Sequence, residues 1–485
     1  MLSFLKRNDI KIGYLLNVIR LVSAALVFII ISPYINRTLG ASNVGKIEYT
    51  VTIINYFLIF SALGIPIYGV RAIARCKGDE KLRSKTTLEL LVILLCTSFV
   101  SYLVLIVLYY LRLFDGYESL IFVLSMMIAL TNIGGEWYFL GKEDHLYITI
   151  RYLLIRILSV LLIFFLVKKS DDIILYAICL VVLNTGGNLL NIFVIAREEL
   201  KIGEFKYRDL EFKKHLRPAL TLFVATVSVN IYLQLDYFLL GYYTTNENVG
   251  YYSVANRLLR YAITFITVIG VVALPRLSNL YLKDKIAYFH LQEKLINYLL
   301  IISVPAFIYF FWFSDAIIAF MGGPEFSSAA FTLKLLSPLC VVVSVAYILG
   351  FLVLYPQSKE HIYTIAVVAT ALFSIIANIS SIEKYKENGA AIVAVLSETL
   401  AIIIMLILIR IKKIPFKVDI LNICKVFSAS AIVFVFFAIG FQHIKDDVTR
   451  ILFGILLLFT YFIVLLIVRE KEIVNSIEFF KSKEK

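Results

Sequence analysis

The stretch YYSVANRLLRYAITFITVIGVVAL, residues 251–274, decides the fold, because it is an apolar run long enough to cross a lipid bilayer and yet contains two arginines. Arg257 and Arg260 lie about one helical turn apart within it. A guanidinium keeps its charge since its pKa stays above about 12, so such residues are costly in hydrocarbon and almost always face a bundle interior or a wet cavity. The pair therefore predicts a membrane helix with a functional polar face.

The composition extends this prediction to the whole chain. The 485 residues are 61% hydrophobic and 17% charged, with a mean hydropathy of +0.89. Soluble domains are about half apolar and about a quarter charged, so we expect an all-α polytopic membrane protein. About fourteen spans fit a hydrocarbon core of ~30 Å, although closely spaced pairs leave twelve or thirteen open. The predicted spans are 13–36, 44–70, 86–111, 117–140, 146–167, 173–196, 216–243, 250–275, 295–320, 331–355, 361–381, 389–410, 420–441 and 449–469.

Lysine and arginine are concentrated in alternate connections between these spans. With the N-terminus inside, the inner connections hold most of them, above all 71–85 and 197–217. This bias predicts that both termini are cytoplasmic, and it explains the net charge of +13 as a topology signal that also favours contact with anionic lipid headgroups. Basic residues spread over every inner loop do not indicate a nucleic-acid partner. The first apolar run lacks a following cleavage site and is expected to be a span, not a removed signal.

The cysteines and histidines indicate no special chemistry. Five cysteines without CxxC spacing predict no disulfide framework, and five scattered histidines predict no metal site. No cofactor is expected.

The chain shows signs of an internal repeat. A shift of 205 residues places the tripeptide at 43–45 on an identical one at 248–250, and Asp79 on Asp284, although chance likeness between apolar helices remains an alternative. An even number of spans per half predicts two six-helix lobes related by a pseudo-two-fold axis along the membrane normal, followed by two C-terminal helices. The predicted domains are an N-lobe at 1–200, a C-lobe at 201–415, and accessory spans with a cytoplasmic tail at 416–485.

Polar side chains also lie inside the seventh and eighth predicted spans. Asn230 and Gln234 are four residues apart and share one helix face, and Asp236 follows them. Tyr261 shares the face of the first of the two arginines. In a purely structural alternative, Asp236 neutralises one arginine and locks two helices together. The other arginine would still need an anion or water.

Further charges lie in the first, fifth and twelfth spans. For Arg20 and Arg156 neither a cavity role nor a packing role is favoured, whereas Arg151 can snorkel to the inner headgroups. Glu398 is an isolated carboxylate, either a partner for an arginine or a protonatable coupling site. The excess of arginine over carboxylate predicts an anionic ligand. Phosphate or pyrophosphate is the simplest choice, because arginine binds it with two parallel hydrogen bonds, although carboxylated sugars would also fit.

Three stretches resemble the polysaccharide (O-antigen and capsule) flippases of the MATE-like multidrug/oligosaccharidyl-lipid/polysaccharide transporter superfamily. They are residues 63–82, 134–172 and 215–280, which begin LGIPIYGVRA, GGEWYFLGKE and HLRPALTLF. The resemblance implies a two-lobed, six-plus-six helix fold with accessory helices thirteen and fourteen. It also implies translocation of undecaprenyl-diphosphate-linked oligosaccharide units between the leaflets of the bacterial inner membrane.

The same resemblance suggests site residues and partners. In the related lipid II flippases, cationic residues on the first and eighth spans line the central cavity, and Arg20, Arg257 and Arg260 occupy matching spans here. The flippases vary in their acidic residues, so a coupling role does not carry over to Asp236 or Glu398. H⁺ or Na⁺ as coupling ion, a polymerase and chain-length proteins are the further partners expected.

Two other classes of function compete with a flippase. A drug or metabolite exporter of the same fold would be expected to carry an acidic or aromatic lining, which the arginine excess disfavours. A membrane enzyme, such as a polymerase or acyltransferase, would need catalytic groups in an outer loop. The predicted outer connections are short and contain neither a histidine beside carboxylates nor a Gly-rich phosphate loop, so we expect no enzyme activity.

Overall fold

The computed structural model describes residues 10–199, 209–441, 446–468, 470 and 472. Within these residues the chain is helical with no strand, which confirms the all-α, multi-pass membrane fold. Ten helical segments of the described part are long and apolar enough to cross a bilayer. Two of them, Leu15–Arg75 and Glu360–Ile411, each contain two predicted spans. Helices therefore cover every span that the sequence predicts.

Contacts divide the chain into two compact units, Met1–Gly241 and Tyr242–Lys485. The first unit extends beyond the predicted N-lobe, which ends at residue 200, because the following helix packs with the helices before it. The predicted lobe boundaries and the symmetry axis between the lobes stay predictions.

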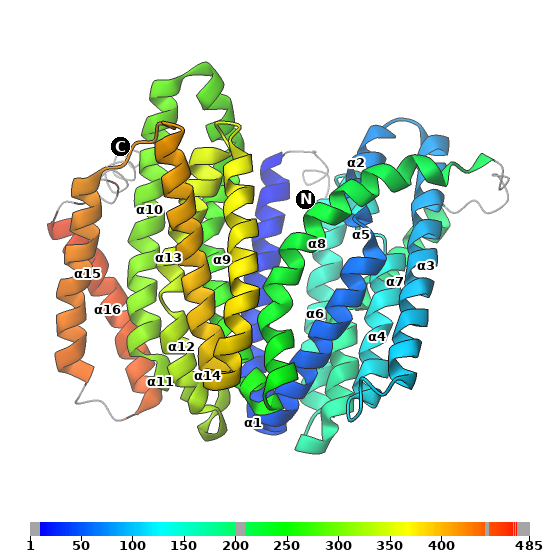
Figure 1. The fold of residues 1–485 in the computed structure, drawn as a ribbon, viewed down its shortest axis with the longest axis horizontal. Coiled ribbons are helices and arrows are strands. Elements are labelled where there is room, and N and C mark those ends of the chain that lie inside the picture. Colours follow the sequence, from blue (N-terminus) through cyan, green and yellow to red (C-terminus); the bar gives the residue numbers. More distant parts are fainter. Residues whose placement is uncertain (1–9, 200–208, 442–445, 469, 471, 473–485) are drawn as a thin grey trace. The chain divides into compact units, whose positions relative to one another are not determined.

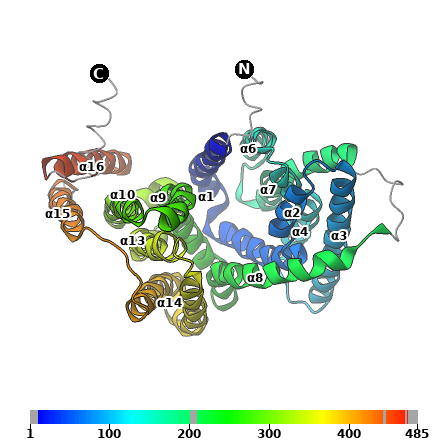
Figure 2. The same ribbon diagram turned by 90° about the horizontal axis from the view of Figure 1, so that it is seen from above.

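Within the described residues, eight α-helices make up the first unit. Figures 1 and 2 show α1, α4, α6 and α7 as neighbours in one upright bundle, and these four helices contact one another in sequence-distant pairs. The helices are α1 (Ile10–Ala62), α2 (Ile65–Arg75), α3 (Glu80–Tyr110), α4 (Glu118–Ile133), α5 (Glu136–Gly141), α6 (His145–Leu166), α7 (Ile173–Glu198) and α8 (Phe212–Tyr243), with a short 3₁₀ turn η1 (Ser170–Asp172) before α7.

Glycines with positive φ mark the breaks in α1 and α2. Gly40 (φ 77°) separates the two predicted spans that α1 contains. Gly64 (φ 75°) turns the chain from α1 into α2, and a Cβ atom there would lie 2.5 Å from the carbonyl oxygen of Ala219 on α8. Only glycine allows both this backbone conformation and this close approach.

Two buried carboxylates tie the ends of α7 and α8 to α3. Glu199, just after α7, accepts hydrogen bonds from Arg83 Nε (2.6 Å), Ser84 Oγ (2.7 Å) and the Tyr138 hydroxyl (2.5 Å). In the same way, Glu89 lies beside α8, where it bonds the backbone N–H of Glu211 and the ring of His215, each at 2.7 Å. These contacts fix the positions of α3, α5, α7 and α8, and two of these helices, α5 and α7, contribute to the candidate site described below.

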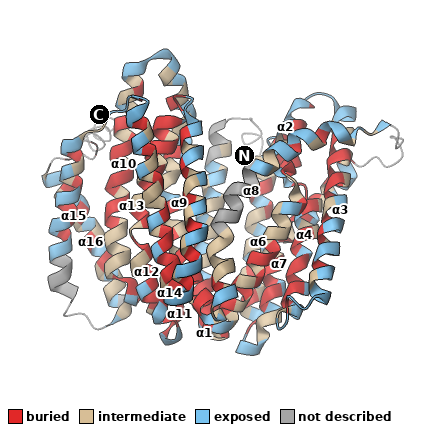
Figure 3. Cartoon of the chain, in the orientation of Figure 1, coloured by how far each residue is buried: buried red, intermediate tan, exposed pale blue. Residues whose placement is uncertain are grey.

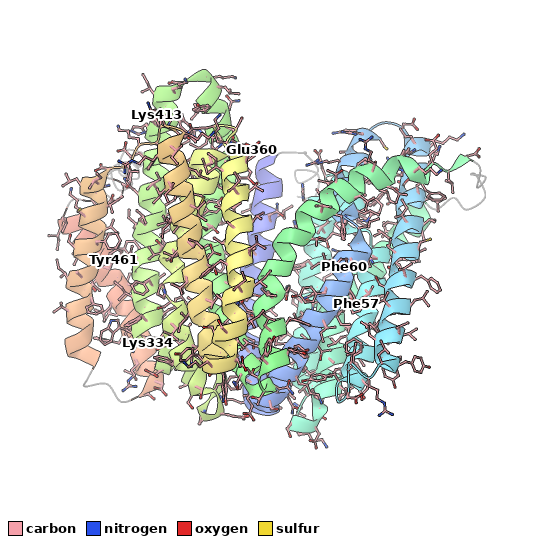
Figure 4. The ribbon with its side chains drawn as sticks, viewed as in Figure 1. Phe57, Phe60, Lys334, Glu360, Lys413 and Tyr461 are labelled. Atoms are coloured by element: carbon pink, nitrogen blue, oxygen red, sulfur yellow. The ribbon has the colours of Figure 1, made fainter. Side chains whose placement is uncertain are left out.

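The second unit is organised around α9, which contacts α10, α12, α13 and α14. Its elements are α9 (Asn246–Lys283), α10 (Lys285–Trp312), α11 (Ser314–Gly322), η3 (Pro324–Phe326), α12 (Ser328–Leu336), α13 (Leu339–Tyr347), a π-helical turn η4 (Ile348–Leu354), α14 (Glu360–Ile411), α15 (Ile420–Phe441) and α16 (Asp447–Ile467). Lys386 breaks α14 between its two predicted spans (φ 53°, ψ −132°). Tyr461 of α16, labelled in Figure 4, donates a hydrogen bond to the carbonyl oxygen of Ile301 on α10 (3.1 Å) and so fastens the C-terminal helix pair.

The two residues that the 205-residue shift aligns have the same local role. Asp79 caps α3 by accepting a hydrogen bond from the N–H of Leu82 (2.9 Å), and Asp284 caps α10 by accepting one from the N–H of Ala287 (3.0 Å). An aspartate side chain at this position satisfies one of the free N–H groups at the start of a helix. In each unit, therefore, an aspartate side chain caps the start of a long helix, α3 in the first and α10 in the second.

The distribution of burial within each unit fits a lipid environment. Figure 3 shows buried residues along the packed faces of the helices and exposed residues on the outward faces and at the helix ends. Large apolar side chains are among the most exposed, including Tyr110, Phe165 and Ile376 at 79, 82 and 73%. In water such a surface would drive aggregation, whereas in a membrane it contacts lipid.

Candidate functional site

One carboxylate in the first unit is shared by two arginines from different helices. Arg20 of α1 and Arg151 of α6 both face Glu136, the first residue of α5. Arg151 Nη2 lies 3.3 Å from Glu136 Oε2, and Arg20 Nη1 lies 3.7 Å from Glu136 Oε1. Each carboxylate oxygen thus faces one guanidinium. The first contact is a charge-assisted hydrogen bond, and the second is an ion pair too long for one.

The sequence GGEWYF explains why Glu136 lies at this point. Gly135 adopts the left-handed conformation (φ 53°) that ends α4, and Gly134 packs so tightly that an added Cβ would lie 2.3 Å from the Cβ of Asn188. Trp137, which is buried, anchors the next position against Gly69 of α2. The backbone of Glu136 is therefore held by its neighbours, while its side chain remains 46% exposed.

Arg151 is built into the protein rather than directed to the headgroups. It is only 5% exposed, and its Nη1 donates to the carbonyl oxygen of Gly187 on α7 (3.2 Å). An added Cβ at Gly187 would lie 3.1 Å from Arg151 Nε, so glycine there makes room for the guanidinium. Snorkelling to the inner headgroups, the structural alternative for Arg151, does not fit these contacts, because the packing of α6 on α7 gives the guanidinium partners inside the protein.

Arg156 extends the cationic region one turn further along α6. Its guanidinium lies over the ring of Tyr152, 4.4 Å from the centroid, and Tyr152 is also within electrostatic range of Arg20. The buried Nε atoms of Arg151 and Arg156 have no hydrogen-bond partner among the described residues. Buried N–H donors without partners are costly, and an acceptor that reached them would be bound favourably.

The charges of this cluster do not balance. Two guanidinium groups, from Arg20 and Arg151, face the single carboxylate of Glu136, and the guanidinium of Arg156 lies over the ring of Tyr152 on the same helix as Arg151. An anion with several oxygens could bind more than one guanidinium at once, in the bidentate geometry that arginine favours. Within the described residues no group of His, Cys, Asp or Glu side chains could hold a metal ion.

The second unit contains the other predicted arginines. Arg257, Arg260 and Tyr261 on α9 are partly buried, and each has an interaction partner. Arg260 lies within electrostatic range of Glu398 on α14, so the partner role considered for Glu398 has a structural basis.

The polar stripe of α8 is only partly described. Asp236, which belongs to the first unit, interacts electrostatically with Tyr56 of α1, and Gln234 is partly buried. The side chain of Asn230 lies outside the described part of the structure. The pairing of Asp236 with one of the α9 arginines stays a prediction.

Each unit therefore brings together part of the predicted set. The first unit gathers Arg20, Arg151 and Arg156, and the second gathers Arg260 with Glu398. Sequence reasoning missed Glu136 and Tyr152, although a carboxylate directly after two glycines inside a predicted span was a signal that could have identified Glu136.

Comparisons with known proteins identify the family of the chain. The family model described as "Polysaccharide biosynthesis protein" matches residues 13–281, which include α1 to α8 and most of α9. A curated protein of Escherichia coli (strain K12), named "Putative O-antigen transporter", is 22% identical over 389 residues, 79% of this chain and 92% of its own length. A protein of the same name from Shigella dysenteriae is 23% identical, over 78% of this chain and 94% of its own length.

Solved structures resemble the fold. The lipid II flippase MurJ in an inward closed conformation matches with a TM-score of 0.68 at 15% identity, covering 94% of this chain and 99% of that one. An inward-facing multidrug resistance MATE family transporter of the MOP superfamily matches with a TM-score of 0.62 at 13% identity, covering 81% and 94%. At this level of identity the likeness concerns the fold alone.

Proposed function

Because the chain belongs to the polysaccharide biosynthesis protein family, we propose that it is a flippase for undecaprenyl-diphosphate-linked oligosaccharide units of O-antigen, capsule or exopolysaccharide. The observation that carries the proposal is the under-neutralised arginine cluster around Glu136 inside a membrane-spanning unit. Moving a pyrophosphate through hydrocarbon without partners is prohibitive, so fixed cations address the main barrier to transfer.

The substrate would be divided among three environments. Its pyrophosphate would pair with Arg20, Arg151 and Arg156 and, in the course of the cycle, with Arg257 and Arg260. Its sugars would occupy a wet, polar-lined space, and its prenyl tail would remain in lipid. Alternating access would then expose the headgroup first to the cytoplasmic and then to the periplasmic leaflet.

The remaining predicted residues have supporting roles in this proposal. Asn230, Gln234 and Tyr261 would supply hydrogen bonds to sugar hydroxyls. Asp236 and Glu398 would act either as charge partners of the arginines or as sites where H⁺ or Na⁺ couples to the cycle. The electrostatic contact between Glu398 and Arg260 supports the partner role for Glu398.

The proposed cellular setting follows from the same substrate. We place the protein in the bacterial cytoplasmic membrane with both termini in the cytoplasm, working alongside a polymerase and chain-length proteins. It would bind and move its lipid-linked substrate without making or breaking covalent bonds, so no cofactor and no enzyme activity is assigned to it.

Charge reversal of the α9 arginines tests the proposal. In a host that depends on this protein for surface polysaccharide, Arg257→Glu with Arg260→Glu should lower export about a hundredfold or more, because two charge-assisted contacts of ~1.5–3 kcal/mol each are lost. The measurements are surface polysaccharide and the lipid-linked intermediate that accumulates inside, at equal amounts of inserted protein.

A matched double variant controls for the change in net charge. Lys81→Glu with Lys283→Glu reverses two exposed charges outside the proposed site and should leave export at the wild-type level. Normal export by the Arg257→Glu, Arg260→Glu variant would refute the proposed role of these two arginines in transport.

Export of drugs or metabolites is the second candidate, because MATE family transporters share the fold. That function predicts resistance to cationic compounds on expression, and no change in surface polysaccharide on deletion. The flippase proposal predicts the reverse for both measurements.

A further inference from the structure

The carboxylate of Glu136 occupies the position that an anionic substrate would need. Its two oxygens face two different guanidinium groups, at 3.3 Å from Arg151 and 3.7 Å from Arg20. A phosphate oxygen pair would approach these arginines in the same way. In the structure, the anion that neutralises these two arginines is the protein's own Glu136 carboxylate.

The two contacts differ in how easily they can be released. Arg151 is 5% exposed and also bonded to Gly187, so it is held in place whatever Glu136 does. Arg20 makes only the longer ion pair with Glu136, and its other described partner is the side chain of Asn17 on its own helix. Arg20 is therefore the cation that an incoming ligand could take over first.

Glu136 itself is able to move aside. Its backbone is fixed by the glycine turn before it and by buried Trp137 after it, whereas its side chain is 46% exposed. Its contact with Arg20, at 3.7 Å, is too long for a hydrogen bond, so the carboxylate loses less on leaving Arg20 than on leaving Arg151. The backbone of Glu136 is thus fixed, while its carboxylate is held weakly by Arg20.

Resting on the proposed function, we propose that Glu136 is a built-in competitor for the substrate pyrophosphate. With no substrate bound, it occupies Arg20 and Arg151 and keeps them in position. The pyrophosphate displaces it on binding, and its return to the arginines on the far side of the cycle helps to expel the headgroup. A carboxylate in this role lowers affinity and raises the rate of release.

The test measures binding of inorganic pyrophosphate to the purified full-length protein in lipid nanodiscs, together with export in cells. Glu136→Gln keeps the shape of the side chain but removes its charge. It should bind pyrophosphate about threefold to tenfold more tightly than wild type, because a competing negative charge is removed, while export becomes slower because release is impaired. Glu143→Gln, which changes an exposed carboxylate that pairs with Lys77 on the surface, should alter neither quantity.

The outcomes separate this proposal from the proposed function. Weaker or unchanged binding by Glu136→Gln, with binding lost in Arg20→Gln and Arg151→Gln, would overturn the competitor role and leave an anion site in which Glu136 only positions the arginines. Absence of pyrophosphate binding in wild type and all variants, with normal export by the arginine variants, would instead refute the arginine cluster as a headgroup site. Tighter binding combined with slower export supports the competitor role.

Discussion

At the scale of single residues, the arginine cluster around Glu136 depends on the packing of Arg151 against α7 as much as on the charge of Arg151. Gly187 provides both the space for the guanidinium and the carbonyl oxygen that accepts its Nη1 hydrogen bond. The neighbouring glycine has a different environment: a Cβ at Gly186 would meet only aliphatic atoms of Val182 and Ile155. Substitutions at Gly187 and Gly186 can thus distinguish a loss of the contacts that hold Arg151 from a general disturbance of helix packing.

We expect Gly187→Ala to reduce export about threefold to tenfold, because displacing Arg151 weakens one charge-assisted hydrogen bond worth ~1.5 kcal/mol. Surface polysaccharide at equal protein levels is the measurement. Gly186→Ala is the matched control and should have no such effect. Equal export by both variants would show that the position of Arg151 does not limit transport.

The residue scale also shows what sequence patterns can and cannot predict. Arg20, Arg151 and Arg156 were identifiable because each is a charge inside an apolar run. Their common partner was not, since Arg20, Glu136 and Arg151 lie on three different helices, and only tertiary packing brings them together. Helical periodicity describes neighbours along one helix and does not give the register between two helices.

At the scale of helices, the first unit is held by polar ties at helix ends as well as by apolar packing. Glu199 is almost fully buried and accepts three hydrogen bonds, from side chains of α3 and α5. Its neighbour Glu198 is exposed and pairs with Lys142 at 2.8 Å. Of these two consecutive carboxylates at the end of α7, Glu199 therefore joins helices inside the protein, whereas Glu198 forms a surface ion pair.

Removing the charge of Glu199 should destabilise the protein substantially. Glu199→Gln leaves Arg83 without its buried anion, and breaking a buried pair in this way costs ~3–5 kcal/mol. The thermal midpoint in detergent should fall clearly, whereas Glu198→Gln should change it little, because its exposed pair is worth at most ~1 kcal/mol. A similar midpoint for both variants would contradict the structural role of Glu199.

The same tie predicts a dependence on pH. Burial raises the pKa of Glu199, but the hydrogen bonds from Tyr138, Ser84 and Arg83 outweigh it and hold the pKa below its ordinary value. A carboxyl with a lowered pKa stabilises the fold fully above its unfolded pKa of about 4.3, and this contribution is lost as the pH falls through the folded pKa. The midpoint difference between wild type and Glu199→Gln should thus be constant from pH 6 to 8 and shrink below pH 4. A difference that changes between pH 6 and 8 would argue against this assignment.

At the scale of the whole molecule, hydropathy predicts the membrane spans well because lipid requires apolar helices of a given length. The breaks at Gly40 and Lys386 separate the spans that hydropathy predicts in α1 and α14, although the breaks themselves are too short to show in composition. Contacts such as that of Gly64 with Ala219, which join α8 to the helices before it, are also not visible in hydropathy. Composition thus gives the number and length of the helices, while tertiary contacts decide how they are grouped.

Labelling of single cysteines tests the predicted orientation. In a background with the five native cysteines replaced by serine, Asp171→Cys should react with a membrane-impermeant maleimide from the periplasmic side, because the turn η1 lies in a predicted outer connection. Lys77→Cys, in a predicted inner connection, should react only after the membrane is opened. The reverse pattern would invert the topology and with it the proposed direction of transport.

The contacts that close the first unit within residues 1–241 also bear on how the protein is made. One of its core clusters, which includes Ile65, Leu90 and Trp137, is made of residues of the first unit. Domains generally fold as units, the N-terminal one first during synthesis. The first unit can therefore pack in the bilayer while the ribosome is still translating the second. A nascent chain arrested after α8 should already resist proteolysis. The order of synthesis would then set the order in which the two units of the transporter assemble.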